Sequence, residues 1–261
     1  MMGAPPEVLI HRDEPLLAAA IAARLVTRIT DVQAAKGGAS VVLSGGGIGI
    51  AALVALRESP AVDAIDWAHL DVWWGDERYV PHDAPDRNEG QAREALLDHV
   101  PVDPARVFPM APSDSPSAHS PEAAAEQYAQ LLASRAAPED HGPVPRFDVF
   151  MLGMGPEGHT ASMFPESPAV RDNRPVVAVH GCPKPPPTRI TMTLPTIGAA
   201  TEAWVLASGE SKAQATRLAL SGAGPVQIPV AGVAGRVRTL WLLDAAAASQ
   251  LPPGLNRIAS P

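Results

Sequence analysis

Apolar residues recur along this chain in two alternating patterns: short continuous runs, and longer segments in which they have helical spacing. The short runs predict strands at residues 39–43, 70–74, 147–152, 176–181, 189–194, 202–207 and 237–244. The longer segments predict helices at residues 13–36, 48–59, 87–100, 122–136 and within 208–222. This alternation favours the α/β class, with a mostly parallel twisted sheet, helices on both faces, and a single domain over residues 1–261.

Local signals make this prediction more specific. Asp13 is expected to cap the first helix, with Pro15 in its first turn and Gly37 at its end. The run 189–194 alternates polar and apolar residues, so we expect that strand to be half-buried. Ligands of parallel sheets gather at the carboxyl ends of strands. Four strand-end clusters are therefore expected to converge: residues 44–47, 75–78, 153–159 and 209–212.

Composition limits the possible partners. The 261 residues are 46% hydrophobic and 18% charged, as in a globular protein, with a net charge of -8 and a pI of about 5.4. This acidity argues against nucleic acid or an anionic membrane as the main partner. A single cysteine, Cys182, excludes an internal disulfide and fits a reducing compartment. With no apolar run of membrane-spanning length, we expect a cytoplasmic protein.

Several catalytic motifs are missing from the sequence. It has no H-E-x-x-H, no C-x-x-C and no histidine pair at ligand spacing, so no metal is expected. It also lacks the G-x-S-x-G of serine hydrolases and the G-x-x-x-x-G-K-[ST] of P-loop nucleotide enzymes.

The glycine-rich segment after the first of these strands has three possible interpretations. It allows a tight turn that brings backbone N–H groups and a helix N-terminus close to a phosphate. Residues 47–52 also satisfy the dinucleotide pattern G-x-G-x-x-A, although the acidic Asp66 precedes the next strand instead of following it. A plain strand–helix turn is the third possibility. Under the phosphate interpretation, the contacting residues are Ser44, Gly45, Gly46 and Gly47.

Charged residues follow the next strand. Asp76, Glu77 and Arg78 either form a solvated salt-bridge cluster or contribute to a ligand site. In the second case the guanidinium of Arg78 would bind carboxylate or phosphate, and Asp76 would shape the loop. Asn88 is expected to pin this loop to the following helix.

The segment "GPEGHTAS" carries the candidate base. Glycines flank Glu157, and His159 is expected to open a short helix, whose N-terminus would favour the neutral imidazole that a general base needs. Glu157 is expected to orient the ring. A purely structural role for His159 is the alternative.

Further along, "CPKPPPTRI" presents two cations on a proline-stiffened segment. Lys184 and Arg189 are either a clamp for phosphate or carboxylate, or solvated loop charges. Ser208 and Lys212 lie near another strand end, where a capped helix start explains them.

In combination, these motifs resemble the 6-phosphogluconolactonase family. The resemblance covers about residues 43–195 and rests on "LSGGG", "WGDERYVP", "LGMGPEGHTASMFP" and "KPPPTRITMTLP" in this order. It implies an α/β fold related to glucosamine-6-phosphate deaminase, no metal or organic cofactor, and hydrolysis of a sugar phosphate lactone in the pentose phosphate pathway. In that reaction His159 would activate water, and Arg78 or a loop N–H would stabilise the oxyanion.

The chain departs from the family pattern in two places. Residues 47–49 read Gly-Ile-Gly where the phosphate loop usually carries hydroxyl residues, and Glu157 replaces the more usual Asp. The deaminase branch typically has Glu five residues after the histidine and Tyr at the position of Arg78. This chain has Phe164 and Arg78 there, which favours the lactonase.

A sugar-phosphate-binding module without catalysis and a nicotinamide dehydrogenase remain as alternatives. The expected partner is a small sugar phosphate lactone, and the protein is expected to be a monomer or a homodimer.

Overall fold

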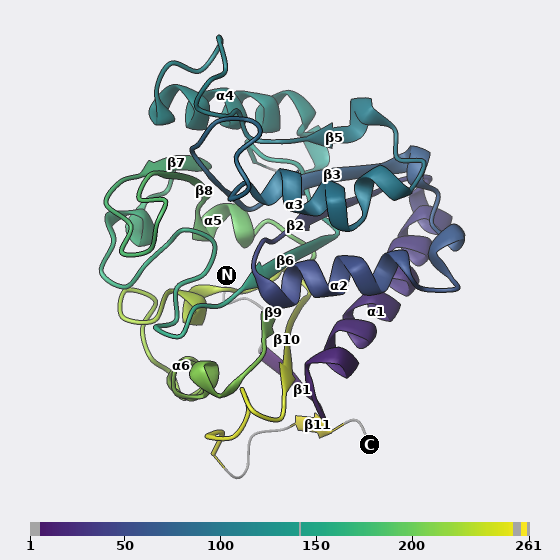
Figure 1. Ribbon diagram of the computed structural model, residues 1–261, viewed down its shortest axis with the longest axis vertical. Coiled ribbons are helices and arrows are strands. Elements are labelled where there is room, and N and C mark those ends of the chain that lie inside the picture. Colours follow the sequence, from purple (N-terminus) through teal and green to yellow (C-terminus); the bar gives the residue numbers. More distant parts are fainter. Residues whose placement is uncertain (1–5, 141, 253–256, 260–261) are drawn as a thin grey trace.

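The computed structural model describes residues 6–140, 142–252 and 257–259. The rest of the expected domain, residues 1–5, 141, 253–256 and 260–261, lies outside the described residues. The centre of the molecule is an eight-stranded sheet in which every pair of neighbouring strands is parallel (Figure 1). In spatial order its strands are β11 (Arg257–Ala259), β1 (Pro6–His11), β10 (Arg238–Asp244), β9 (Glu202–Ala207), β6 (Val149–Gly153), β2 (Ala39–Leu43), β3 (Leu70–Trp74) and β5 (Val107–Phe108).

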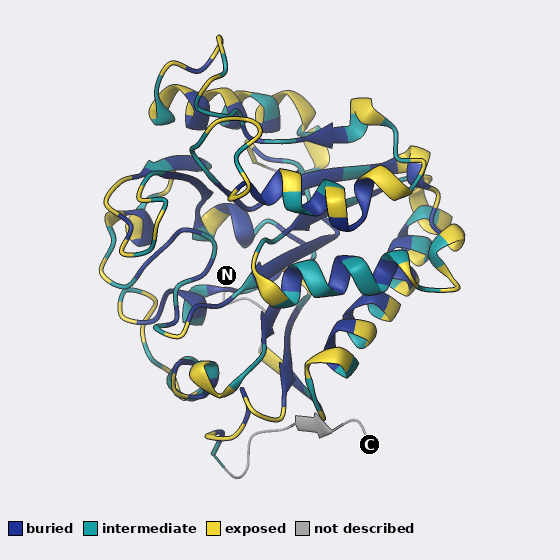
Figure 2. Cartoon of the chain, viewed as in Figure 1, coloured by how far each residue is buried: buried dark blue, intermediate teal, exposed yellow. Residues whose placement is uncertain are grey.

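Both faces of this sheet are covered. Neighbouring residues of a strand point to opposite sides, so Val41 and Leu43 pack into one hydrophobic cluster and Val42 into the other. The first cluster includes residues of α1 (Glu14–Lys36), α2 (Gly47–Arg57) and α3 (Asn88–Ala95). The second includes residues of α4 (Pro121–Arg135), α5 (Leu194–Ile197) and α6 (Ala213–Leu220). The strands are buried and the outer sides of the helices are exposed (Figure 2), which confirms the predicted fold class.

The ends of α1 follow from its sequence. The carboxylate of Asp13 accepts a hydrogen bond from the Leu16 N–H at 3.0 Å, and Pro15 lies in the first turn. At the other end Gly37 has φ 82°, and its N–H bonds to the Gln33 carbonyl at 2.8 Å. The predicted cap and stop are confirmed. Within the described residues every helix is too short or too polar to cross a bilayer.

A second, smaller sheet was not predicted. It is antiparallel and consists of β4 (Asp76–Arg78), β8 (Arg189–Met192) and β7 (Val176–Val179). The expectation that the strand around residues 189–192 is half-buried was wrong, since all four of its residues are buried. β8 is the central strand of the small sheet, and its apolar residues pack in the second cluster. The pairing places Arg189 opposite Arg78.

The order of the strands determines where a ligand can bind. From β2 the chain runs outward on one side through β3 and β5, and it then returns to the other side of β2 as β6. Adjacent strands whose connections leave in opposite directions open a crevice at their carboxyl ends. That crevice lies between β2 and β6.

Candidate functional site

A pocket of about 290 Å³ lies at these carboxyl ends. It brings together nine of the ten predicted site residues, and the tenth, Glu157, lies against His159. The nine lining residues are Ser44, Gly45, Gly46, Gly47, Asp76, Arg78, His159, Lys184 and Arg189. A larger cavity of about 670 Å³, between α1 and strands β1, β9 and β10, contains none of them.

The glycine loop forms one wall of the pocket. The Ser44 hydroxyl accepts a hydrogen bond from the Gly153 N–H at 2.9 Å and donates one to the Gly45 carbonyl at 3.2 Å, so it ties β2 to β6. Gly46 has φ 84°, in the region that favours glycine. A Cβ at Gly45 would lie 2.0 Å from Oδ1 of Asn88. Glycine is therefore needed here for close packing, and α2 begins at Gly47 with its free N–H groups at the pocket.

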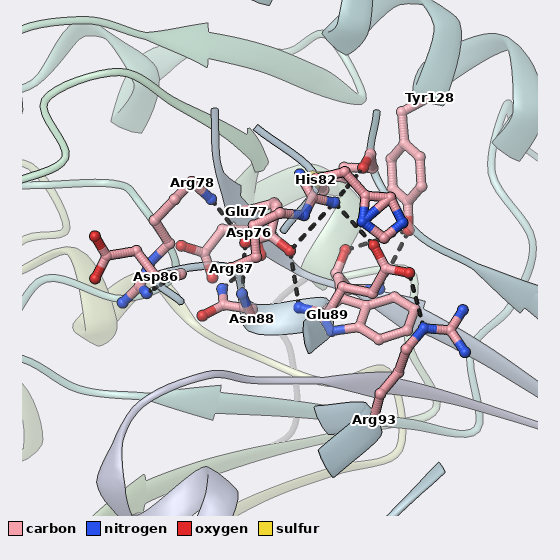
Figure 3. A network of polar contacts seen from close by, with 12 residues as sticks. Asp76, Glu77, Arg78, His82, Asp86, Arg87, Asn88, Glu89, Arg93 and Tyr128 are labelled. Carbon is pink, nitrogen blue, oxygen red and sulfur yellow. Dashed lines mark hydrogen bonds and ion pairs between the residues drawn. The ribbon is translucent and has the colours of Figure 1, made fainter. Parts of the chain in front are cut away.

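A buried polar network supports the adjoining wall (Figure 3). The fully buried carboxylate of Glu77 accepts hydrogen bonds from the N–H groups of Arg78, Asn88 and Glu89, at 2.8, 2.7 and 2.9 Å. Glu77 thus caps the N-terminus of α3, although it lies eleven residues before Asn88 in the sequence. Burial raises the pKa of Glu77, and the buried guanidinium of Arg87, 3.7 Å away, opposes that rise. This network fixes the loop that carries Arg78 into the pocket.

Asp76 and Arg78 occupy different positions in this wall. One carboxylate oxygen of Asp76 accepts a hydrogen bond from the Ser162 hydroxyl at 2.7 Å. The backbone carbonyl of Asp76 accepts another from Nδ2 of Asn88 at 2.9 Å. The expectation that Asn88 pins the loop is confirmed. Arg78 donates through Nη1 to the Asp86 carbonyl, while its buried Nε has no hydrogen-bond partner among the described residues.

His159 presents its ring to the pocket from the loop after β6. Its Nδ1 lies 2.8 Å from Oε1 of Glu157, and its ring stacks on Phe164 with centroids 4.5 Å apart. The side chain is 16% exposed. Burial lowers the pKa of His159; Glu157 and Asp76 oppose this effect, and Lys184 adds to it. The lowered pKa favours the neutral imidazole at neutral pH, and Nε2 makes no hydrogen bond with any residue that the structure describes.

The prediction that His159 opens a helix was wrong. Its neighbour Thr160 pairs with Met154 in an isolated β-bridge, and Ala161 has a positive φ of 48°. A residue in that conformation cannot continue a right-handed helix. Burial takes the place of the expected helix N-terminus as the cause of the lowered pKa.

The cations of the pocket differ in how they are paired. Lys184 donates to Oε2 of Glu157 at 3.0 Å. Burial acts to raise the pKa of Glu157. Hydrogen bonds from its own N–H and from Lys184 oppose this effect, as do the charge and the hydrogen bond of His159, and together they lower the pKa to about 2. Arg189 is 5% exposed and donates to the carbonyls of Pro186 and Lys184, both at 3.1 Å, so it holds the proline loop in shape.

Lys212 is the lining cation that the sequence interpretation left aside. It belongs to the short 3₁₀ helix Glu210–Lys212 after β9, and its ammonium makes no hydrogen bond or ion pair with any described residue. Burial lowers the pKa of Lys212, and so does the charge of Lys184. The signal in the sequence was its place in a strand-end cluster. Two further lining residues, Glu14 and Ser208, were not among the predicted site residues; they hydrogen bond to each other at 2.6 Å.

Comparison with known proteins identifies the family. Residues 12–241 match the sequence model described as glucosamine-6-phosphate isomerases/6-phosphogluconolactonase. The chain belongs to this family. It is 58% identical over 260 residues to a 6-phosphogluconolactonase of Streptomyces coelicolor, with 99% of this chain and 100% of that protein covered. It is 52% identical over 244 residues to a 6-phosphogluconolactonase of Mycobacterium tuberculosis, with 93% and 97% covered.

The fold of a family member agrees with this. The solved structure of 6-phosphogluconolactonase from Trypanosoma brucei superimposes with a TM-score of 0.80 at 30% identity, over 96% of this chain and 100% of that one. The family resemblance of the sequence motifs is thereby confirmed.

Proposed function

We propose that the protein hydrolyses 6-phospho-D-glucono-1,5-lactone to 6-phosphogluconate, the second step of the oxidative pentose phosphate pathway. The names and high identity of its relatives support this reaction. The observation that carries the mechanism is the imidazole of His159, bound through Nδ1 to Glu157 at 2.8 Å and neutral because of its burial. A base in this state has an open Nε2 that can take a proton from water.

The chemical step is addition of water followed by ring opening. The oxygen of water attacks the lactone carbonyl carbon while Nε2 of His159 accepts its proton. Negative charge develops on the former carbonyl oxygen, where the guanidinium of Arg78 or a loop N–H stabilises it. When the intermediate collapses, the bond from carbon to the ring oxygen breaks, and the proton on His159 passes to that oxygen. General-base assistance of this kind contributes about 10²–10⁴-fold.

Binding of the phosphate orients the lactone for this step. The free N–H groups at the start of α2 and the glycine loop face the pocket, an arrangement that suits an anion. We assign the unpaired ammonium of Lys212 to the phosphate together with this loop. Arg189 and Lys184, the clamp expected from the sequence, lie in the same pocket but donate to protein acceptors.

The remaining properties belong to the same proposal. The composition and the single cysteine support a cytoplasmic enzyme with no nucleic-acid or membrane partner. As part of the proposal, it acts on a small sugar phosphate as a monomer or homodimer. Because the proposed chemistry uses only protein groups, chelating agents are expected to leave activity intact.

A glucosamine-6-phosphate deaminase is the nearest alternative. Phe164, five residues after the histidine, occupies the position where the deaminase pattern has a glutamate, and it stacks on the His159 ring. No carboxylate is available at that position.

The test is hydrolysis of freshly prepared lactone, corrected for spontaneous opening, with glucosamine 6-phosphate and NADP⁺ offered separately. Lactone turnover supports the proposal. Release of ammonia from glucosamine 6-phosphate supports a deaminase. Binding of 6-phosphogluconate without lactone turnover supports a non-catalytic module. Tight binding of NADP⁺ supports a dehydrogenase.

A further inference from the structure

Three side chains form a continuous chain of contacts from the rim of the pocket to the base. Lys184 donates to Oε2 of Glu157 at 3.0 Å, and Oε1 of the same carboxylate meets Nδ1 of His159 at 2.8 Å. We propose that Lys184 is a positioning residue: by holding one oxygen of Glu157, it fixes the other against Nδ1 of His159 and so keeps Nε2 free as the base. This inference rests on the proposed function.

Both ends of Lys184 are held in place. Its carbonyl accepts a hydrogen bond from Nη2 of the buried Arg189 at 3.1 Å, which also binds the neighbouring proline carbonyls. Its ammonium is paired with Glu157. The ammonium of Lys212, on the same pocket, has no hydrogen bond or ion pair with a described residue, so the two lysines differ in what they can bind.

The pairing has a consequence for the tautomer of the imidazole. A carboxylate only accepts hydrogen bonds, so Nδ1 must carry the hydrogen that points to Glu157. In the neutral ring Nε2 then has the lone pair. A carboxylate held at one oxygen only could rotate away from the ring. Lys184 holds the second oxygen and restricts that rotation.

The electrostatic effect of Lys184 on His159 can be measured. The groups that influence the charged imidazole are Glu157 of its own loop, Lys184 of the proline loop and Asp76 of β4. Arg78, Arg189 and Lys212 line the same pocket from β4, β8 and the 3₁₀ helix after β9. Glu157 and Asp76 favour the imidazolium, and Lys184 disfavours it.

Removal of Lys184 is therefore expected to raise the pKa of His159. At a separation of several ångströms and partial exposure, the loss of one positive charge corresponds to about half a pKa unit to one unit. The acid limb of kcat/KM moves to higher pH by the same amount. Looser orientation of the ring lowers kcat on the plateau by about tenfold, less than the ~10²-fold of a full ångström of displacement.

The experiment is an NMR titration of the histidine ring signals in the free protein, with parallel kinetics on the lactone. The chain has eight histidines, so the His159 signal is assigned from its absence in His159→Gln. Lys184→Met removes the charge, Lys184→Arg retains it, and Lys212→Met is the matched control for a lysine on the same pocket.

We expect the pKa of His159 to rise in Lys184→Met and to return toward the wild-type value in Lys184→Arg. In Lys212→Met it should stay within about 0.2 units, because Lys212 is not among the groups that shift the pKa of His159. An unchanged pKa together with an unchanged plateau kcat in Lys184→Met overturns the inference, whether KM rises, as for a direct phosphate contact, or stays the same. The titration needs no substrate. If the lactone is not hydrolysed but the pKa moves, the proposed reaction fails while the coupling of Lys184 to His159 stands.

Discussion

Gly155 provides a direct test of the geometry around the base. A Cβ built at this position would lie 2.0 Å from Nδ1 of His159 and 2.8 Å from Oε2 of Glu157, whereas ordinary contact begins at 3.4 Å. The methyl group of Gly155→Ala therefore has to push the ring by more than an ångström, which breaks its 2.8 Å contact with Glu157. Displacement of a catalytic group by about 1 Å can cost ~10²-fold.

We expect Gly155→Ala to lower kcat for lactone hydrolysis by about 10²-fold, with KM changed far less because the proposed phosphate site lies elsewhere in the pocket. The control is Gly90→Ala in α3, where a Cβ meets nothing within 4 Å; it should retain activity and gain about 0.5–1 kcal/mol of stability. Initial rates with fresh lactone, together with circular dichroism, measure both effects. A folded Gly155→Ala variant with a kcat within about threefold of wild type would refute the assigned position of the base.

Three further predictions concern the same pocket. Because burial lowers the pKa of His159 from its usual 6.5, kcat/KM should fall on acidification with a midpoint below pH 6.5, as the imidazole gains a proton; a midpoint above 6.5 contradicts this. Lys212→Met should raise KM about tenfold or more with kcat nearly unchanged, since a hydrogen bond to a charged group contributes ~1.5–3 kcal/mol; saturation kinetics with an unaltered KM would remove Lys212 from the phosphate site. Glu77→Ala leaves three buried N–H groups without their acceptor and removes one of the two carboxylates beside Arg87, which keeps its pairing with Glu89; it should cost ~3–5 kcal/mol in denaturant unfolding. The exposed Glu94→Ala on the same helix should cost less than about 0.5 kcal/mol, and equal losses for the two would argue against the network.

The sequence predicted those parts of the fold that depend on local signals. The strand Leu70–Trp74 has the predicted bounds. Asp13 caps the start of α1 and Gly37 terminates it, as expected. The strand-end clusters converge because all strands of the large sheet are parallel, which the strand–helix alternation already indicated.

The features that were missed depend on distant contacts. The small sheet pairs Asp76 with Thr191, and no local pattern encodes a pairing over that separation. The burial of β8 follows from the same pairing. His159 was predicted to open a short helix, but its neighbour Thr160 instead forms a β-bridge with Met154. The partners of the two lysines could not be predicted from the sequence either. Only the folded chain shows that Lys184 hydrogen bonds to Glu157 and that Lys212 has no such partner among the described residues.

The role of His159 as general base is the central claim, and the turnover of His159→Ala on fresh lactone tests it most directly. After correction for spontaneous hydrolysis, we expect kcat to fall by about 10²–10⁴-fold with KM nearly unchanged. A correctly folded His159→Ala protein whose kcat stays within about tenfold of wild type would show that another group activates the water.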